Sequence, residues 1–305
     1  MQGLVMKSTG SWYDVRIEKG EMIRCRLRGK LKLTEIRTTN PVAVGDIVEF
    51  EMEKQGGGII SGILPRKNYI IRKSAKIEIF GHIIASNVDQ AVLVVSLTFP
   101  RTSIGFIDRY LANTESFRIP AKIIFNKADL LDDDLKLLHT DLSRLYTDLG
   151  YENVLISAIF DQDFGIFFKW FEGKKTLLSG HSGVGKSTIL NRLDPSLNLA
   201  TKEVSTFANK GTHATTFATM FELNENSFVI DTPGIRELGM IDMEDWEISH
   251  YFPEMRDHLG ECRYNNCLHI NEPGCKVLEL LGEGKIYQSR YKSYIGMVMN
   301  EDTRK

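Results

Sequence analysis

The chain has 305 residues, of which 42% are hydrophobic and 26% are charged, and its formal net charge is −2. This length allows two or three compact domains of ordinary globular composition. The longest purely apolar run, at 91–95, is too short to span a bilayer, and the first residues lack the apolar core of a signal peptide, so we expect a cytoplasmic protein without a membrane partner.

Residues 1–70 indicate a small β-barrel. Polar and apolar positions alternate through 11–33, turn residues occur near Gly20 and Gly29, and further strands are expected at 44–53 and 59–65. About five short strands with a polar face suit an OB-fold. We therefore expect an N-terminal β-barrel that binds RNA.

The same region is basic. Residues 1–73 contain 14 Lys or Arg against 8 Asp or Glu, a net charge of +6, whereas residues 239–305 contain 8 against 12, a net charge of −4. Five cations fall at every second position: Arg24, Arg26, Arg28, Lys30 and Lys32. If the strand stays extended through Gly29, these cations share one face that could follow the phosphate backbone of RNA. The alternative is a solvated face whose charge discourages edge pairing.

Residues 71–238 alternate between expected strands and helices. Buried parallel strands are predicted for the apolar runs at 91–97, 121–126, 154–157, 176–179 and 228–231. Helices are predicted at 107–117 and 133–150, the second ending at Gly150, which suits a left-handed cap. This alternation is typical of a doubly wound α/β domain.

The stretch GHSGVGKST at 180–188 has the spacing of a phosphate-binding loop and follows a predicted strand. Backbone N–H groups of such a loop and the helix N-terminus behind it converge on phosphate. Lys186 would reach the β- and γ-phosphates, and Ser187 would bind Mg²⁺. The predicted nucleotide-binding residues here are Gly180, His181, Ser182, Gly183, Val184, Gly185, Lys186, Ser187 and Thr188. An ordinary glycine-rich turn is the alternative.

Two segments after this loop fit the switch regions of a GTPase. Asp231 begins Asp-Thr-Pro-Gly at 231–234 and would hold Mg²⁺, while the Gly234 N–H would meet the γ-phosphate. In the switch I position, 206–217, Thr215 is the first choice for the Mg²⁺-binding threonine and Thr216 the second.

Ile235 stands where Ras-like enzymes carry a glutamine that orients water. This substitution implies slow intrinsic hydrolysis, or another group that supplies the function. His213 is the nearest candidate in sequence, and a merely exposed histidine is the alternative.

The base-reading candidate, Asn-Lys-Ala-Asp at 126–129, lies at the end of a predicted strand. The Asp129 carboxylate can accept from N1–H and N2–H₂ of guanine, which adenine cannot offer, so the contact favours GTP over ATP. Asn126 would bond the other edge of the base and Lys127 would cover its face. The backbone at Ala128 lies within this motif, and Ser157 and Ala158 suit the loop that contacts the guanine carbonyl.

The predicted guanine-binding motif at 126–129 precedes the phosphate loop at 180–188, which is the reverse of the usual order in GTPases. This is the order expected of a circularly permuted GTPase domain, which we place at 71–238.

Residues 239–305 show no convincing strand. The stretch 242–258 is predicted to be helical up to Pro253, and 277–301 to form one or two terminal helices. Three thiols and one imidazole lie close together in sequence: Cys262, Cys267, His269 and Cys275. A Cys₃His set suits one tetrahedral, structural Zn²⁺, and free buried cysteines are the alternative. We therefore expect a mostly helical zinc-binding domain at 239–305.

Together these motifs resemble the family of ribosome small-subunit-dependent GTPases of the RsgA/YjeQ type. Asn-Val-Asp-Gln at 87–90 and the stretch KGTHATT at 210–216 are also similar to that family, although Thr212 and Ala214 replace its usual Arg and Thr. The resemblance implies GTP hydrolysis stimulated by the 30S subunit during late maturation, with His213 assisting hydrolysis.

We expect a monomer whose partners are GTP or GDP, the 30S subunit and 16S rRNA. The alternatives are another permuted GTPase, of the 50S subunit or a membrane, and an RNA-binding protein with a structural nucleotide pocket.

Overall fold

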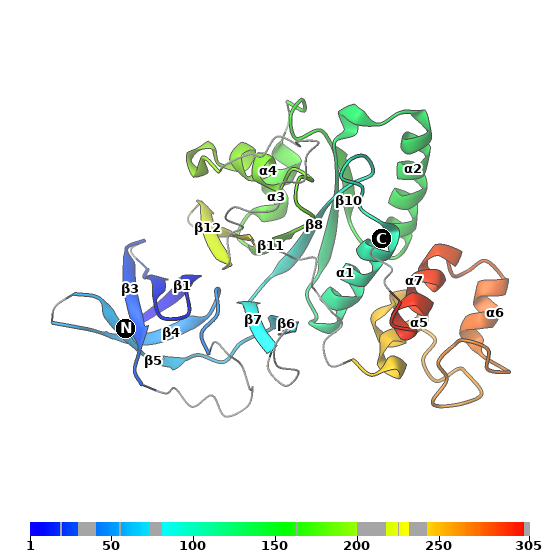
Figure 1. Ribbon diagram of the computed structural model, residues 1–305, viewed down its shortest axis with the longest axis horizontal. Coiled ribbons are helices and arrows are strands. Elements are labelled where there is room, and N and C mark those ends of the chain that lie inside the picture. Colours follow the sequence, from blue (N-terminus) through cyan, green and yellow to red (C-terminus); the bar gives the residue numbers. More distant parts are fainter. Residues whose placement is uncertain are drawn as a thin grey trace. The chain divides into compact units, whose positions relative to one another are not determined.

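The computed structural model describes residues 1–18, 20–29, 41–54, 56–73, 81–162, 164–199, 218–224, 226–231 and 243–301 (Figure 1). The chain divides into two compact units. The first unit consists of Met1–Val92 and Asp161–Gly239, and the second unit of Leu93–Phe160 and Met240–Lys305. Each unit is therefore built from two separate stretches of the chain.

The N-terminal part of the first unit is a five-stranded barrel. Its strands are β1 (Gln2–Ser8), β2 (Tyr13–Arg16), β3 (Met22–Leu27), β4 (Ile47–Met52) and β5 (Gly58–Ile63). They follow the order β1-β2-β3-β5-β4, and β4 pairs with β1 to close the barrel. The pairing is antiparallel except between β3 and β5. The predicted barrel is confirmed.

Alternation of side chains across these strands builds the barrel core. Tyr13, Val15, Ile23 and Cys25 are buried, whereas the intervening arginines of β3 point to solvent. The extended stretch ends at Leu27, earlier than the predicted strand, and Gly29 has φ +56. The condition that the strand stay extended through Gly29 is therefore not met, because a positive φ interrupts a pleated strand.

The rest of the first unit continues from the barrel into an α/β sheet. Strand β12 (Thr219–Asn224) lies between β1 and β13 (Ser227–Asp231), and β13 pairs in parallel with β11 (Lys175–Ser179). The helices are α3 (Gly165–Phe171), α4 (Lys186–Leu193) and the 3₁₀ turn η2 (Pro195–Leu197). A separate hairpin joins β6 (Tyr69–Lys73) to β7 (Gly81–Ser86).

The second unit contains three strands in the order β10-β9-β8. They are β8 (Gln90–Ser96), which begins in the first unit, β9 (Ala121–Asn126) and β10 (Asn153–Ile156). Every residue of β8 is buried, as predicted for a parallel strand covered on both faces. Helix α1 (Ile104–Ser116) begins at the Ser103 N-cap, and α2 (Asp133–Asp148) at the Asp132 N-cap, whose carboxylate accepts from Leu135 N.

The C-terminal part of the second unit is helical. Its elements are η4 (Asp245–Tyr251), α5 (Pro253–Arg256), α6 (Lys276–Gly282) and α7 (Gln288–Val298), and residues 243–301 contain no strand. Pro253 begins α5, where the missing N–H of proline is harmless, although it was predicted to end a helix. These helices share a core with Ala112 of α1.

The predicted fold class, a β-barrel followed by an α/β domain and a helical C-terminal region, is confirmed. The domain boundaries at 70 and 238 stay a prediction.

Buried Asp46 links the barrel to the segments that follow it. Its carboxylate accepts from Arg66 Nε at 2.7 Å, Arg66 Nη2 at 2.6 Å, Ser86 Oγ at 2.6 Å and Ala43 N at 2.8 Å. Both the Asp46 and Arg66 side chains are shielded from water, at 0% and 10% exposure. Removing one partner leaves an uncompensated buried charge.

We predict that Asp46→Ala lowers the local free energy of unfolding of the barrel by about 3–5 kcal/mol. The measurement is hydrogen exchange of the Tyr13 and Val15 amides in the full chain, with the exposed Asp133→Ala variant as the control. Equal protection in the two variants would contradict the prediction.

Candidate nucleotide site and metal centre

The predicted phosphate loop in the first unit has the backbone that such a loop needs. It connects β11 to α4, and its three glycines Gly180, Gly183 and Gly185 have φ values of +145, +83 and +104. Side chains rarely tolerate these conformations, so glycine allows the tight wrap. Val184 is fully buried and anchors the loop, whereas Ser182 and Gly183 are exposed. The N-terminus of α4 thus opens onto a loop suited to phosphate.

Lys186 and Asp231 lie at the same end of this sheet. Asp231 is opposite Leu178 in the β11–β13 pairing, and Leu178 lies two residues before Gly180 in the chain. The Lys186 ammonium donates to Gly180 O at 2.7 Å and His181 O at 2.9 Å, which holds it over the loop. Burial lowers the pKa of Lys186, and the Asp231 carboxylate opposes this shift. Ser187 and Thr188, on the first turn of α4, are partly exposed.

The predicted base-reading residues gather in the second unit where β9 and β10 end. Ile156 is opposite Asn126, so the segment after β10 starts beside the segment after β9. Buried Asn126 accepts from Ala158 N through Oδ1 at 2.9 Å. Ser157 donates to Asp129 Oδ1 at 2.5 Å and thereby orients an exposed carboxylate. Asn126 and Asp129 of the Asn-Lys-Ala-Asp motif therefore lie next to Ser157 and Ala158, which were predicted from a separate segment.

Lys127 and Ala128 shape the turn between them. Lys127 has φ +71, and Ala128 begins the 3₁₀ turn η1 (Ala128–Leu130), which carries Asp129. The Lys127 ammonium donates to Phe99 O at 2.8 Å. Burial lowers the pKa of Lys127, and the nearby Asp129 carboxylate opposes this shift.

Several predicted residues lie outside the described residues. They are His213, Thr215, Thr216 and Gly234 of the switch segments, and Lys30 and Lys32 of the basic stretch. Their predicted roles stay predictions.

The four predicted metal ligands in the second unit lie close enough together to hold one metal ion. The ligand atoms of Cys262, Cys267, His269 and Cys275 all lie within 4.8 Å of one another. Cys262 Sγ is 3.9 Å from Cys275 Sγ, and His269 Nδ1 is 3.5 Å and 3.4 Å from these two sulfurs. Tetrahedral zinc with ordinary bond lengths requires edges of about 3.8 Å between sulfurs and about 3.6 Å between sulfur and nitrogen. The residues therefore fit Zn²⁺.

Burial keeps the thiols of this cluster protonated unless a cation binds to them. Burial raises the pKa of Cys267 to about 12 and raises the pKa of Cys275. Thiolates at neutral pH would therefore need a positive charge at the centre of the cluster. Burial lowers the pKa of His269, although Glu272 opposes the shift, which favours the neutral imidazole that binds metals.

Hydrogen bonds hold the loop that carries these ligands. Glu272 accepts from the backbone N–H groups of Leu268 and Ile270, each at 2.8 Å. Tyr294 and Tyr291 of α7 donate to Leu268 O at 2.7 Å and His269 O at 2.8 Å. His269 itself has φ +55, a strained conformation that these contacts stabilise.

The barrel arginines predicted to contact RNA differ in their partners. Arg26 pairs with Glu53 and Arg28 with Glu51, each at 2.6 Å and at the surface. Within the described part of the chain, Arg24 has no carboxylate partner. Its guanidinium instead lies 4.8 Å from the ring centroid of Trp12.

Trp12 is a candidate RNA-contacting residue that the sequence reasoning missed. It is 43% exposed and precedes β2. An exposed aromatic side chain beside a cation suits stacking on a nucleic acid base. In the sequence, the signal that could have identified Trp12 is its position one predicted hairpin before the basic stretch.

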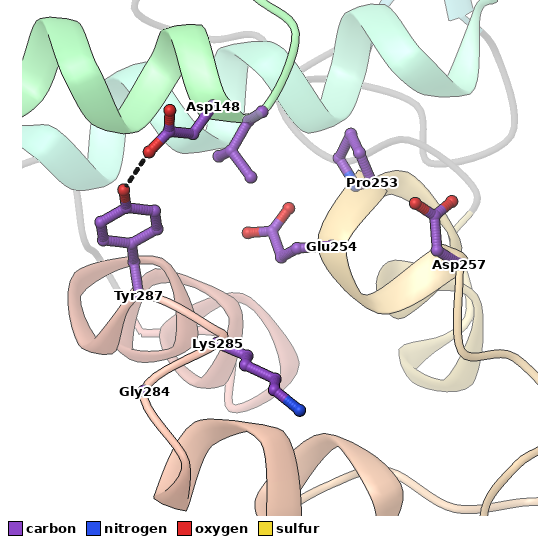
Figure 2. A pocket seen from close by; sticks show the side chains of 8 residues that line it. Asp148, Pro253, Glu254, Asp257, Gly284, Lys285 and Tyr287 are labelled. Atoms are coloured by element: carbon purple, nitrogen blue, oxygen red, sulfur yellow. Dashed lines mark hydrogen bonds between the residues drawn. The ribbon is translucent and has the colours of Figure 1, made fainter.

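A separate cavity of about 350 Å³ in the second unit lies where α2 ends, α5 begins and α6 connects to α7 (Figure 2). Three carboxylates, Asp148, Glu254 and Asp257, line it together with Lys285, and Tyr287 donates to Asp148 at 2.5 Å. None of the predicted site residues lines this cavity. Its acidic lining is also unsuited to a nucleotide phosphate.

Among the described residues, no helix combines the length and apolar character that a bilayer span requires.

Comparison with known proteins identifies the family. The model of the RsgA GTPase family matches residues 63–241, and that of the RsgA N-terminal domain matches residues 2–60. A Bacteroides fragilis protein named small ribosomal subunit biogenesis GTPase RsgA is 46% identical over 305 residues, covering 100% of this chain and 98% of the relative. A Cytophaga hutchinsonii protein of the same name is 47% identical and covers 100% of both chains.

Solved structures agree. YjeQ from Thermotoga maritima superposes with a TM-score of 0.79 at 32% identity, covering 98% of this chain and 97% of that one. YloQ, described as a circularly permuted GTPase, gives a TM-score of 0.75 at 30% identity, with coverage of 100% and 96%. Motifs, fold and full-length similarity agree, and the chain belongs to the RsgA GTPase family.

Proposed function

We propose that this protein hydrolyses GTP and assists the biogenesis of the small ribosomal subunit, with the subunit stimulating hydrolysis. The observation that carries the proposal is the presence of both a phosphate loop and an oriented Asn-Lys-Ala-Asp turn inside the range that matches the RsgA GTPase family. The names of the relatives point to the small subunit. We further propose that the protein acts as a monomer in the cytoplasm, where this partner would be met.

Hydrolysis would use the phosphate loop together with the predicted switch segments. The loop 180–188 binds the phosphates, with Lys186 neutralising the negative charge that develops on them. Ser187, Thr215 and Asp231 hold the Mg²⁺ that accompanies GTP, and Gly234 contacts the γ-phosphate. His213 assists the attack of water.

Guanine recognition would rest on Asp129, with Ser157 fixing the direction of its carboxylate and Asn126 bonding to the opposite edge of the base. This role is supported by the 2.5 Å hydrogen bond between Ser157 and Asp129 and by the exposure of Asp129. Lys127 covers the base, and the turn at Ala128 and the loop at Ala158 approach it with their backbone.

The barrel and the metal centre would serve subunit binding. One Zn²⁺ held by Cys262, Cys267, His269 and Cys275 stabilises the C-terminal fold, because all four donors are protein groups. The barrel contacts 16S rRNA through Trp12, through Arg24, Arg26 and Arg28, and through the lysines that follow them. Its net positive charge supports this role and predicts binding that weakens with salt.

The proposed function predicts that purified 30S subunits raise multiple-turnover GTP hydrolysis by roughly tenfold or more, a common size for coupling between sites. Lys186→Ala should lower the stimulated rate by about a hundredfold, because a preorganised charge at the phosphates is lost. The measurement is phosphate release with 30S, with 50S and without subunits. Stimulation by 50S alone, or a fully active Lys186→Ala variant, would refute the proposal.

Guanine recognition predicts that Asp129→Asn weakens GTP binding by about a hundredfold, since hydrogen bonds to a charged group contribute about 1.5–3 kcal/mol each. The variant should prefer xanthosine triphosphate, whose C2 carbonyl accepts from the new amide. Nucleotide affinities measured by calorimetry test this, with the exposed Asp134→Asn as the control. An unchanged base preference would mean that another residue reads the base.

The metal centre predicts about one zinc ion per chain by elemental analysis. Cys267→Ser should lose this zinc and lower the melting temperature of the C-terminal helices, followed by Trp246 fluorescence. Cys25→Ala is the matched control, because Cys25 lies in the barrel core and should keep the zinc content. A zinc-free wild-type protein with intact helices would rule out the site.

A further inference from the structure

One continuous row of residues joins the barrel to the phosphate half of the first unit. Lys7 of β1 is opposite Thr219 of β12, Thr219 is opposite Asp231 of β13, and Asp231 is opposite Leu178 of β11. The first barrel strand is thus two strands away from the residue proposed to hold Mg²⁺.

A desolvated ion pair lies beside this row. Arg16 of β2 donates to Glu222 of β12 twice, through Nε to Oε2 at 2.7 Å and through Nη2 to Oε1 at 2.5 Å. The side chains are only 16% and 31% exposed, and the Arg16 guanidinium is 5.6 Å from the ring centroid of Phe228. Since β1 separates β2 from β12 in the sheet, the pair spans the barrel–sheet junction.

This bidentate geometry fixes direction as well as distance, because the planar guanidinium fork matches a carboxylate in one orientation. Glu222 is opposite Phe228, so the same contact also reaches β13. Strand β12 directly follows the predicted switch I segment, and β13 leads into Asp-Thr-Pro-Gly. A shift of the barrel against β12 would therefore reach both predicted switch segments through hydrogen-bonded strands.

We propose that Arg16 and Glu222 are a positioning pair that couples contact of the barrel with rRNA to GTP hydrolysis. The pair touches neither nucleotide nor RNA, and acts by holding β12 against the barrel. This inference rests on the proposed function, since it assumes stimulation by the small subunit.

The test compares Arg16→Glu, Glu222→Arg and the double charge reversal with wild type, using Lys136→Ala as a matched loss of one exposed ion pair. Each variant is assayed for basal GTP hydrolysis and for hydrolysis stimulated by 30S. Cosedimentation with 30S is measured in the presence of a non-hydrolysable GTP analogue. Each single variant should keep the basal turnover and 30S binding of the wild type. The factor by which 30S stimulates its hydrolysis should be about tenfold smaller than in the wild type. The double variant should recover it, as expected for residues that interact directly.

Single variants with wild-type stimulation would overturn the inference. So would a loss of 30S binding that accounts for the lost stimulation, because the pair would then belong to the binding surface. If the charge reversals lower the melting temperature, Glu222→Gln provides the milder test, since it keeps the size and one acceptor. A well-folded Glu222→Gln variant must also lose part of the stimulation.

The proposed function is tested separately in the same assay by the wild-type protein. Stimulated wild type with unaffected variants refutes only the positioning pair, whereas wild type that 30S does not stimulate refutes the proposed function.

Discussion

Antiparallel pairing between β1 and β12 is the constraint on which the first unit depends. A strand register cannot drift, because a slip by one residue would turn every side chain to the opposite face. The buried Val5 and the antiparallel pairing with β2 and β4 fix this strand in the barrel, and the same backbone fixes β12 through Lys7 and Thr219. The position of Asp231 is therefore set by hydrogen bonds that start in the barrel.

A buried charge cluster plays the corresponding role in the second unit. Arg290 of α7 is fully buried and donates to Asp108 of α1 at 2.8 Å and to Glu254 of α5 at 2.7 Å, over the ring of Phe252. Taking these charges out of water is unfavourable, so the loss of one partner would leave an uncompensated buried charge between the three helices. The helices that carry the metal centre are thereby tied to α1, which follows β8 of the base-reading sheet.

The candidate site residues could be predicted because they occur in local sequence patterns. Contacts between residues far apart in the sequence could not be predicted in this way. The phosphate loop, the Asn-Lys-Ala-Asp turn and the Cys₃His set each depend on spacing within a few residues, so this spacing was sufficient to identify them in the sequence. Strands β6, β7 and β12 went unpredicted, since short strands are stabilised by partners far away in sequence. For the same reason, the pairing of Arg26 with Glu53 could not be anticipated from alternation alone.

The ion pairs of the barrel are compatible with the proposed contact between its cationic face and RNA. The Arg26 and Arg28 side chains are 54% and 58% exposed, and exposed pairs contribute only about 0–1 kcal/mol, so a phosphate can replace Glu53 or Glu51 at little cost. Arg16, at 16% exposure, instead holds the carboxylate of Glu222 through two hydrogen bonds. Burial therefore separates arginines that can exchange partners from the one that maintains the junction, although all of them belong to the same small barrel.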